Sequence, residues 1–440
     1  MKLKNNQVEN RANVEEPKSR AEKRREIVLK NMVMNANKML RKLGAQNHFP
    51  LYGMTYFLNL LKKTYSDMED IGRGTDCMTF GLFCVMIPEE LIYAAGGIPV
   101  KLCGGSHVSA AIGDEVMPRD ACPLVKAVMG CASMELLPVG NNCHSFIVPS
   151  TCDCKRKMAG ELESFKEVYP LHVPSTRELD EQKEYFLEEL YGLLRHLEKA
   201  TGNKVSSEKL LNSTHEIAKA QKEVYRLYTI QKNNPPVMHG SQVITVLNTY
   251  AFDHVKRWTS ALALLNDELE ERIKNQQFAA KAKMPRIMIV GSPVIFPNIK
   301  IPILIEESGG IVAIDETCAG FRWLYDPVVV RESNLEELMR SLANRYMLPC
   351  TCPTFVNNEQ RIFKLQQMIE EFQIDGLVYH MLRGCLAYDS EYAMVEQAME
   401  QLGIPIVKVE TDYNEEDIEQ LRIRFEAFIE LIKHSKYSRV

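Results

Sequence analysis

Twelve cysteines are the residues of this chain best suited to chemistry, and two of them follow predicted strands. Residues 145–150 form an apolar strand pattern that leads to Cys152, and residues 376–380 form another that leads to Cys385. Ligands of open α/β sheets bind beyond the carboxyl ends of the strands. Both thiols are therefore expected at ligand-binding positions.

Three further cysteines stand at predicted helix N-termini: Cys122, Cys350 and Cys352. The helix dipole and the free N–H groups lower the pKa of a thiol there and favour the thiolate, which is the form that binds soft metals. If the two halves of the chain face each other, these thiols converge on one cleft.

The spacing of the cysteines narrows the choice of metal site. The only close pairs are Cys-X-Cys, at 152/154 and 350/352, which argues against a zinc ribbon with its C-x2-4-C pairs. No C-x2-C-x2-C run of a ferredoxin exists, and a redox-active dithiol stays open although C-x-x-C is absent. An iron–sulfur cluster clamped between two domains by scattered thiolates remains. Cys77, Cys131, Cys103 and Cys143 are interpreted as apolar core residues.

The sequence lacks the patterns typical of membrane, secreted, nucleic-acid-binding and nucleotide-binding proteins. No apolar run approaches the roughly 18 to 20 residues of a membrane span, and the polar N-terminus is no secretory signal, so a cytoplasmic location is expected. The net charge of −5 suggests no nucleic-acid partner. The chain contains no Gly-Lys dipeptide and therefore no Walker A loop, so any ATP is hydrolysed elsewhere. No G-x-G-x-x-G follows a strand.

Alternating strand and helix patterns predict an α/β fold with two Rossmann-like, flavodoxin-like parallel-sheet domains. We expect a helical extension over residues 1–50, a first α/β domain over 51–176, a helical layer over 177–284 and a second α/β domain over 285–440. The first domain has predicted strands at 98–102, 145–150 and 171–173. The second has them at 286–290, 311–315, 376–380 and 404–410.

The two α/β halves also resemble each other. Each gives a helix, Gly-Gly, a strand and a cysteine, at Cys103 and at Cys318. Each places Cys-Pro at a helix start, at Cys122 and at Cys352. This pattern indicates a duplicated domain with matched cysteines.

Several stretches together resemble a known superfamily. They are FCVMIPEELIYAAGGIPVKL, PRDACPLVKAVMG, STCDCKRKM, EESGGIVAIDETCAG, LPCTCPT, DGLVYHMLRGC and GIPIVKVETDY. Over residues 75–435 the chain is similar to the 2-hydroxyacyl-CoA dehydratase and benzoyl-CoA reductase superfamily, and within it to the double-cubane cluster proteins. The resemblance implies an oxygen-sensitive cluster in an interdomain cleft, an anaerobic cytoplasm, and a separate ATP-hydrolysing iron–sulfur activator that supplies low-potential electrons.

The resemblance also implies a ligand set. A dehydratase subunit holds one [4Fe–4S] cubane by three cysteines, which correspond here to Cys122, Cys152 and Cys385. A double-cubane protein holds an [8Fe–9S] group by six, and the additional family positions here are Cys84, Cys318 and one of Cys350 and Cys352. The surplus of thiols favours the double cubane, and Cys154 is interpreted as a bystander.

Three further residues are candidate catalytic residues. Lys126 follows Cys122 by one helical turn and could place a cation near an anionic cluster. His380 and Arg383 flank Cys385 and could donate hydrogen bonds to sulfide or substrate. The sequence thus predicts a homodimeric reductase of a small substrate. The alternatives are a single-cubane dehydratase or benzoyl-CoA reductase subunit, and a non-catalytic electron carrier.

Overall fold

The computed structural model describes residues 19–46, 49–68, 77–250, 252–323 and 326–437. Residues 1–18 and 47–48 of the predicted N-terminal extension lie outside the described residues. Among the residues described, no helix combines the length and the apolar character needed to cross a membrane.

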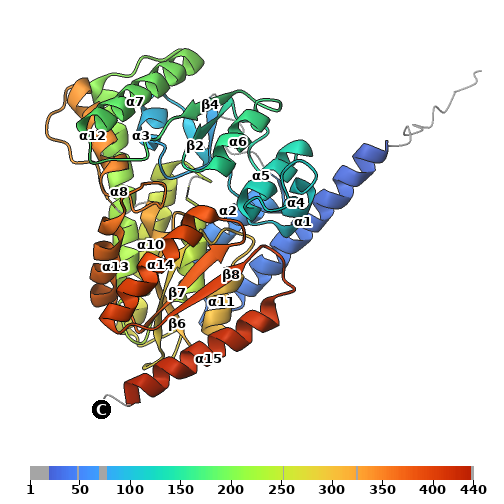
Figure 1. Cartoon of the computed structure of the whole chain (residues 1–440), viewed down its shortest axis with the longest axis vertical. Coiled ribbons are helices and arrows are strands. Elements are labelled where there is room, and N and C mark those ends of the chain that lie inside the picture. Colours follow the sequence, from blue (N-terminus) through green and yellow to red (C-terminus); the bar gives the residue numbers. More distant parts are fainter. Residues whose placement is uncertain (1–18, 47–48, 69–76, 251, 324–325, 438–440) are drawn as a thin grey trace, which may run out of the picture.

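Two four-stranded parallel sheets form the framework, which confirms the predicted α/β class (Figure 1). The strands of the first sheet lie in the order β2-β1-β3-β4, and those of the second in the order β6-β5-β7-β8. The first sheet consists of β1 (Thr79–Leu82), β2 (Ile98–Lys101), β3 (Ser145–Pro149) and β4 (Val168–Leu171). The second consists of β5 (Arg286–Gly291), β6 (Ile311–Glu316), β7 (Gly376–Leu382) and β8 (Ile406–Thr411).

The two sheets therefore share one topology, as the internal resemblance of the halves predicts. In each sheet the chain order reverses at one strand, β1 or β5, whose neighbours follow it on opposite sides. Crevices at such points, beyond the carboxyl ends of the strands, are where open α/β sheets bind ligands. Strand β1 was missing from the sequence-based prediction, and it is the strand that leads to Cys84.

Helices cover the sheets, which explains why the strands are apolar on both sides. All seven residues of β7 are buried, as expected for a central strand of a parallel sheet. The first sheet is flanked by α3 (Glu89–Ala94), α4 (His107–Gly113), α5 (Pro123–Ser133) and α6 (Asp153–Leu162). The second is accompanied by α11 (Lys300–Glu307), a 3-10 turn (Phe321–Trp323), α12 (Leu335–Met347), α13 (Glu359–Phe372), α14 (Leu386–Leu402) and α15 (Ile418–Tyr437).

Long helices connect the two sheets. They are α7 (Asp180–Thr201), α8 (Ser207–Gln231), α9 (Gly240–Asn248) and α10 (Val255–Lys274). In α7, Phe186, Leu190 and Leu197 are buried at helical spacing and form the apolar stripe that packs against the body. Helix α8 contacts α3 of the first half and both α12 and β6 of the second half, so this layer joins the two halves of the molecule.

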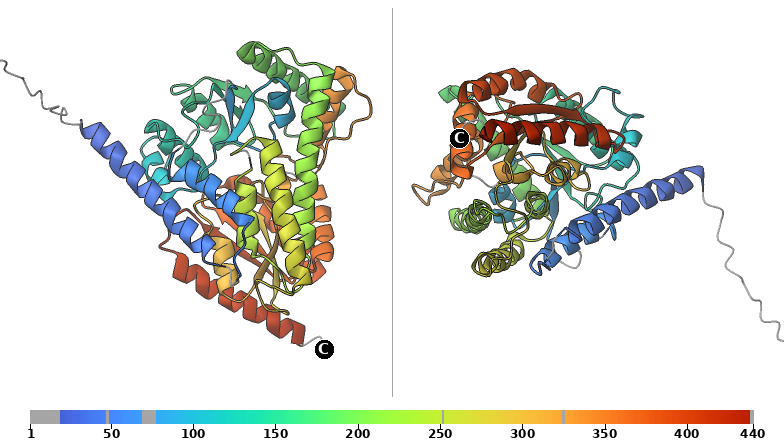
Figure 2. Two further views of the ribbon diagram at one scale, coloured as in Figure 1. Left: turned by 180° about the vertical axis from the view of Figure 1, so that it is seen from behind. Right: turned by 90° about the horizontal axis from the view of Figure 1, so that it is seen from below.

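The N-terminal helices α1 (Arg20–Gly44) and α2 (Met54–Tyr65) lie along the other side of the molecule (Figure 2). Helix α1 contacts both halves, because Arg24 pairs with Glu115 beside α4 and Lys38 pairs with Glu415 before α15.

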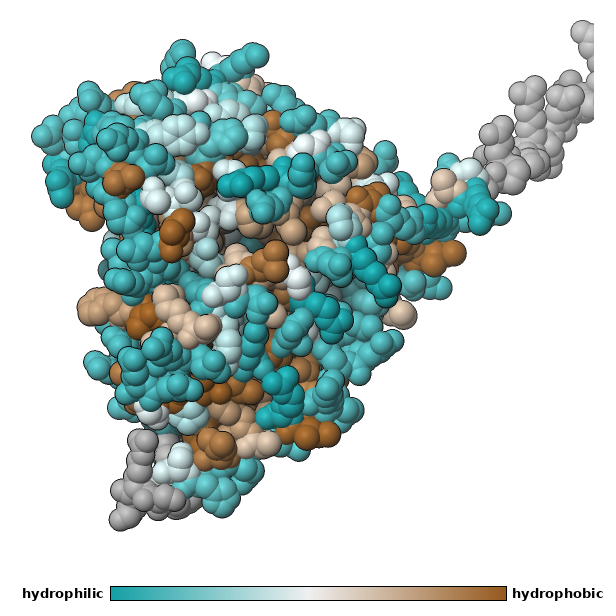
Figure 3. All heavy atoms as spheres, in the orientation of Figure 1, coloured by the Kyte–Doolittle hydropathy of each residue, from teal (hydrophilic) through white to brown (hydrophobic). Residues whose placement is uncertain are grey.

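On the face in Figure 3, apolar and neutral residues gather in the middle, between mainly hydrophilic outer parts.

Candidate metal centre

A cavity of about 480 Å³ lies where the carboxyl ends of the two sheets meet. Its wall contains residues from the loops after β1, β3, β5, β6 and β7, so both halves of the chain contribute. Eight cysteines line it: Cys84, Cys103, Cys122, Cys152, Cys154, Cys318, Cys352 and Cys385. All twelve cysteines of the chain are free thiols, so no disulfide competes for these sulfurs.

Helix starts hold three of these thiols in place. Cys122, Cys152 and Cys385 are the N-cap residues of α5, α6 and α14. Gly384 explains how two of them come together. It has a φ of +74°, and a Cβ there would lie 2.3 Å from the carbonyl oxygen of Asp120. Only glycine allows this close approach, which brings the start of α14 against the loop that precedes Cys122.

The thiols of Cys122 and Cys385 form a hydrogen bond with each other. Cys385 is the acceptor, and this bond, more than any other contact, lowers its pKa to about 7. The same bond and burial hold the pKa of Cys122 well above its usual range. Cys152 lies near enough to Cys385 to feel its charge. We call Cys122, Cys152 and Cys385 the first triad.

A second set of thiols lies in the same cavity wall. Cys84 follows β1 and interacts electrostatically with Cys318, which follows β6, and with Cys352. Burial raises the pKa of both Cys318 and Cys352. We call Cys84, Cys318 and Cys352 the second triad.

Cys350 and Cys352 lie close to each other but line different pockets. Cys352 lines the cavity, whereas Cys350 lines a small pocket beside Arg345 and Tyr346. The sulfur of Cys350 lies 3.4 Å from the Sδ atom of Met86, another side chain of that small pocket. Only one member of this Cys-X-Cys pair is therefore presented to the cavity.

The remaining cysteines differ from the two triads. Cys103 lines the cavity, yet its thiol donates to the carbonyl of Phe83, and burial raises its pKa to about 11. Cys131 bonds the Ser109 hydroxyl at 3.0 Å and is buried, as is Cys143, in agreement with the predicted core role. The core interpretation of Cys77 was wrong, because this residue is exposed where the chain enters β1.

Two lysines reach the cavity that the sequence did not single out. Lys101 is the last residue of β2, is 6% exposed, and its Nζ lies 4.5 Å from the ring centre of Trp323. Lys155 lies in the first turn of α6 and lines the cavity wall. Lys155 is partly exposed; desolvation acts to lower its pKa, but the charges of the surrounding thiols raise it overall, so this ammonium stays charged. Burial, in contrast, lowers the pKa of Lys101.

The three residues predicted as catalytic lie outside the cavity wall. Lys126 pairs with Asp114 at 2.8 Å. His380 is buried in β7, where desolvation lowers its pKa to about 4, and its Nδ1 lies 2.8 Å from the carbonyl oxygen of Ser292. Arg383 is 64% exposed and pairs with Asp412 at 3.3 Å.

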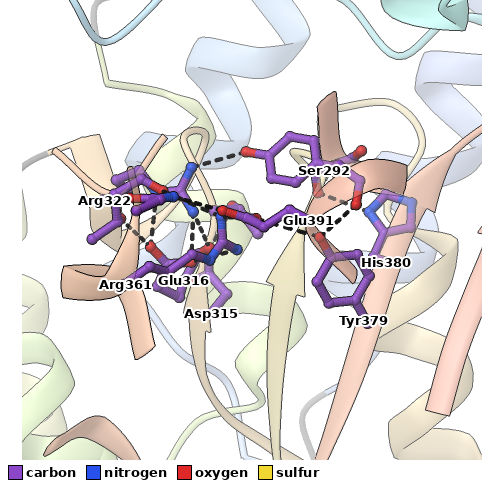
Figure 4. A network of polar contacts seen from close by, with 12 residues as sticks. Ser292, Asp315, Glu316, Arg322, Arg361, Tyr379, His380 and Glu391 are labelled. Carbon is purple, nitrogen blue, oxygen red and sulfur yellow. Dashed lines mark hydrogen bonds and ion pairs between the residues drawn. The ribbon is translucent and has the colours of Figure 1, made fainter. Parts of the chain in front are cut away.

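A buried polar network connects Glu316, Arg322, Arg361 and Glu391 (Figure 4). Arg361 is fully buried and pairs with Glu316 at 3.0 Å and with Glu391 at 2.7 Å. Glu316 ends β6, two residues before Cys318, and accepts a hydrogen bond from the Thr351 hydroxyl, next to Cys352. The network thus joins the two loops that carry these cysteines.

The same network reaches the cavity wall through Tyr388. Arg322 pairs with Glu316 and donates to the Tyr388 hydroxyl oxygen at 2.8 Å. Tyr388 lines the cavity, and burial raises its pKa well above its usual range. Its O–H group is therefore a retained proton donor on the wall.

The donor set is chemically suited to an iron–sulfur cluster, because it consists of cysteine thiols. Within the described part of the chain, no three His, Cys, Asp or Glu side chains are placed to hold one metal ion. The thiols of a cluster bind different irons and stand farther apart than the ligands of one ion. Scattered thiolates with two lysines beside them suit an anionic iron–sulfur group.

The hydrogen bond between Cys122 and Cys385 leads to a prediction for metal-free protein. Cys385 should be alkylated by iodoacetamide with a midpoint near pH 7, because its thiolate fraction rises as pH passes its pKa of about 7. In the Cys122→Ala variant the stabilising donor is lost, and the midpoint should move to higher pH. Mass spectrometry of the Cys385 peptide over a pH series measures this. An unchanged midpoint in the variant contradicts the bond.

Comparison with known proteins places this chain in a family. The family model described as 2-hydroxyglutaryl-CoA dehydratase, D-component, matches residues 84–432, which include all six triad cysteines. The Escherichia coli (strain K12) protein named "Putative dehydratase subunit YjiM" is 30% identical over 359 residues, 80% of this chain and 91% of that protein.

Two enzyme subunits are more distant relatives. The β subunit of (R)-2-hydroxyglutaryl-CoA dehydratase from Acidaminococcus fermentans is 24% identical, over 78% of this chain and 89% of its own length. A benzoyl-CoA reductase subunit from Thauera aromatica is 22% identical, over 79% and 89%. The chain belongs to the 2-hydroxyglutaryl-CoA dehydratase D-component family, within the superfamily that includes the benzoyl-CoA reductases.

Proposed function

We propose that this protein is an iron–sulfur reductase that holds an [8Fe–9S] double cubane between its two sheets. The observation that carries the proposal is the cavity whose wall includes the six triad thiols, which come from both halves of the chain. Relatives that are dehydratase and reductase subunits support an enzymatic role. When bound, such a group would supply two electrons at low potential from one place.

Each triad would supply the three cysteine ligands of one cubane. Cys122, Cys152 and Cys385 would hold one cubane, and Cys84, Cys318 and Cys352 would hold the other. Cys352 takes this role in place of Cys350, because only Cys352 lines the cavity. Cys103 keeps its proton and its bond to Phe83, which leaves it outside the ligand set.

The rest of the wall suits a small substrate of low polarity. Phe83, Leu124, Val125, Ile295 and Trp323 line the cavity, and apolar walls exclude water from the reacting groups. The Tyr388 hydroxyl, held by Arg322, can offer a proton to a substrate that receives electrons. A reduction needs a proton for each electron, so a donor on the wall supports this chemistry.

The electrons would come from a separate ATP-hydrolysing iron–sulfur activator, because the chain lacks a Walker A loop of its own. Relatives named as subunits of a dehydratase and of a reductase belong to multi-component enzymes, which supports a partner component. We further propose a homodimer that works in an anaerobic cytoplasm.

One alternative has an observation in its favour. Several relatives are named as dehydratase subunits, one of them for phenyllactyl-CoA and one for 2-hydroxyglutaryl-CoA. On that basis the chain would be part of a 2-hydroxyacyl-CoA dehydratase, with one [4Fe–4S] cubane on the first triad. The second triad would then have no ligand role.

Two measurements on anaerobically purified protein separate these functions. The double cubane predicts about eight irons per chain, and the single cubane about four, from their stoichiometries. With activator and ATP present, the reductase should transfer electrons to a small unsaturated probe molecule such as acetylene and so reduce it. A preparation with about four irons that instead dehydrates a 2-hydroxyacyl-CoA establishes the alternative. Full iron with no turnover of either substrate identifies an electron carrier.

A further inference from the structure

Lys155 lines the same cavity as the cysteines of both triads. Its neighbours, in order of electrostatic effect, are the thiols of Cys84, Cys152, Cys103 and Cys318. Cys385 also feels its charge. One ammonium therefore faces sulfurs from both halves of the chain and from both triads.

The position of Lys155 is built by the start of α6. Cys152 is the N-cap of this helix, and Lys155 follows three residues later. The side chain lies in the wall shared by the cavity and a neighbouring pocket of about 460 Å³. Asp153, the acid of this helix turn, is directed to Arg156 at 3.2 Å. Within the described residues, no carboxylate forms a salt bridge with Lys155.

The other cations near the thiols are neutralised or act mainly on one triad. Arg322 and Arg361 are paired with Glu316, and Arg361 also with Glu391. The thiols that affect Lys101 most are those of Cys103, Cys318 and Cys84, so its charge acts mainly on the second triad. The carboxyl of Glu89 lies near Lys101, but burial raises its pKa to about 8, so it is mostly uncharged at neutral pH. Lys155 is thus the uncompensated charge common to both triads.

We propose that Lys155 sets the electron affinity of the whole iron–sulfur group, while Lys101 adjusts mainly the part held by Cys84 and Cys318. This inference rests on the proposed function. Each electron adds a negative charge close to the ammonium, in a site of low dielectric where attraction is strong. Lys155 makes the first reduction easier and couples the two triads through one shared charge. It acts through the bound group and is not itself a catalytic residue.

The test compares four variants of the full chain, purified anaerobically: Lys155→Met, Lys155→Arg, Lys101→Met and Lys157→Met. Lys157 lies on the same helix and is exposed, so its variant is the matched control. Stepwise redox titration followed by electron paramagnetic resonance gives the midpoint potential of each reduction step. Iron and sulfide content is measured on the same samples.

In Lys155→Met the first reduction should be at least tenfold less favourable. This corresponds to a midpoint potential that is about 59 mV more negative for a one-electron step. Lys155→Arg keeps the charge and should restore most of the shift. Lys101→Met should shift mainly one reduction step, and Lys157→Met should shift neither. The shifts should persist in high salt, because buried charges are weakly screened.

The outcomes distinguish this inference from the function on which it rests. Unmodified protein with little iron defeats the proposed function. Normal iron with unchanged potentials in Lys155→Met defeats the role of Lys155 alone. If Lys155→Met loses its iron, the arginine variant decides the matter. Recovery of iron and potential by arginine supports a charge effect, whereas failure of both variants shows that Lys155 is needed for its shape and overturns the inference.

Discussion

Replacing Cys318 by alanine should lower the iron content from about eight to about four per chain, because one cubane loses a ligand while the first triad stays intact. Reduction of a small substrate should fall at least about 100-fold, since even residues behind metal ligands cost 10- to 100-fold when mutated. Cys318 was chosen because it lies in the second triad, next to Cys84 and apart from the bond between Cys122 and Cys385. Iron and sulfide assays and activity with the activator measure both effects.

The matched control is Cys350→Ala. Its thiol lies next to Met86 in a separate small pocket, so iron should stay near eight per chain. Cys352→Ala, in contrast, should behave like Cys318→Ala. If Cys350→Ala loses iron and Cys352→Ala keeps it, the assignment of the pair is reversed. If Cys318→Ala retains all its iron, the second triad is wrong.

Arg361→Met should destabilise the protein by about 3–5 kcal/mol, the usual cost of removing one partner from a buried ion pair. Arg361 is fully buried, and its loss leaves the carboxylates of Glu316 and Glu391 without this partner. Its guanidinium also donates to the carbonyl of Thr351, beside Cys352. The variant should therefore show a lower urea midpoint and, where it folds, selective loss of iron from the second triad.

Arg340→Met provides the comparison for this effect. Arg340 pairs with Glu184 between α12 and α7, and both side chains are exposed. Exposed pairs contribute about 0–1 kcal/mol, so the urea midpoint should barely change. Equal effects of the two variants would show that burial of the network adds nothing to stability.

Sequence patterns predicted most of the strands because parallel strands buried on both faces are continuous apolar runs. The strand predicted at 171–173 was misplaced, since β4 covers Val168–Leu171 and is mostly not buried. Residues 376–380 and 311–315 are such runs, and they became β7 and β6. Strand β1 was missed because it runs directly into the apolar residues that precede α3. Without β1, the order of the first sheet and the place of Cys84 could not be derived from strand patterns.

The sequence did not reveal which lysine lines the cavity. Lys126 lies four residues after the N-cap Cys122, and Lys155 lies three residues after the N-cap Cys152. One residue turns a helix by about 100°, and this difference directs one lysine to Asp114 and the other to the cavity. A lysine three residues after Cys152 was visible in the sequence. Its place beside thiols of the second half depends on how the two halves pack, which no local pattern shows.

The sequence also did not show which of Cys350 and Cys352 faces the cavity. Both precede the same helix, and spacing gives them equal access to a metal. The Glu316 and Arg361 network, which holds Thr351 between them, determines which thiol faces the cavity. That network joins residues from three separate elements, so no local pattern could reveal it.

Anomalous diffraction at the iron edge, on crystals grown without oxygen, tests the central claim most directly. We predict iron density inside the cavity, with about eight irons bonded to sulfurs of both Cys152 and Cys385 and also of Cys84, Cys318 and Cys352. Irons bound to Cys122, Cys152 and Cys385 alone would reduce the account to a single cubane. A cavity without iron in crystals of freshly prepared, active protein would contradict it altogether.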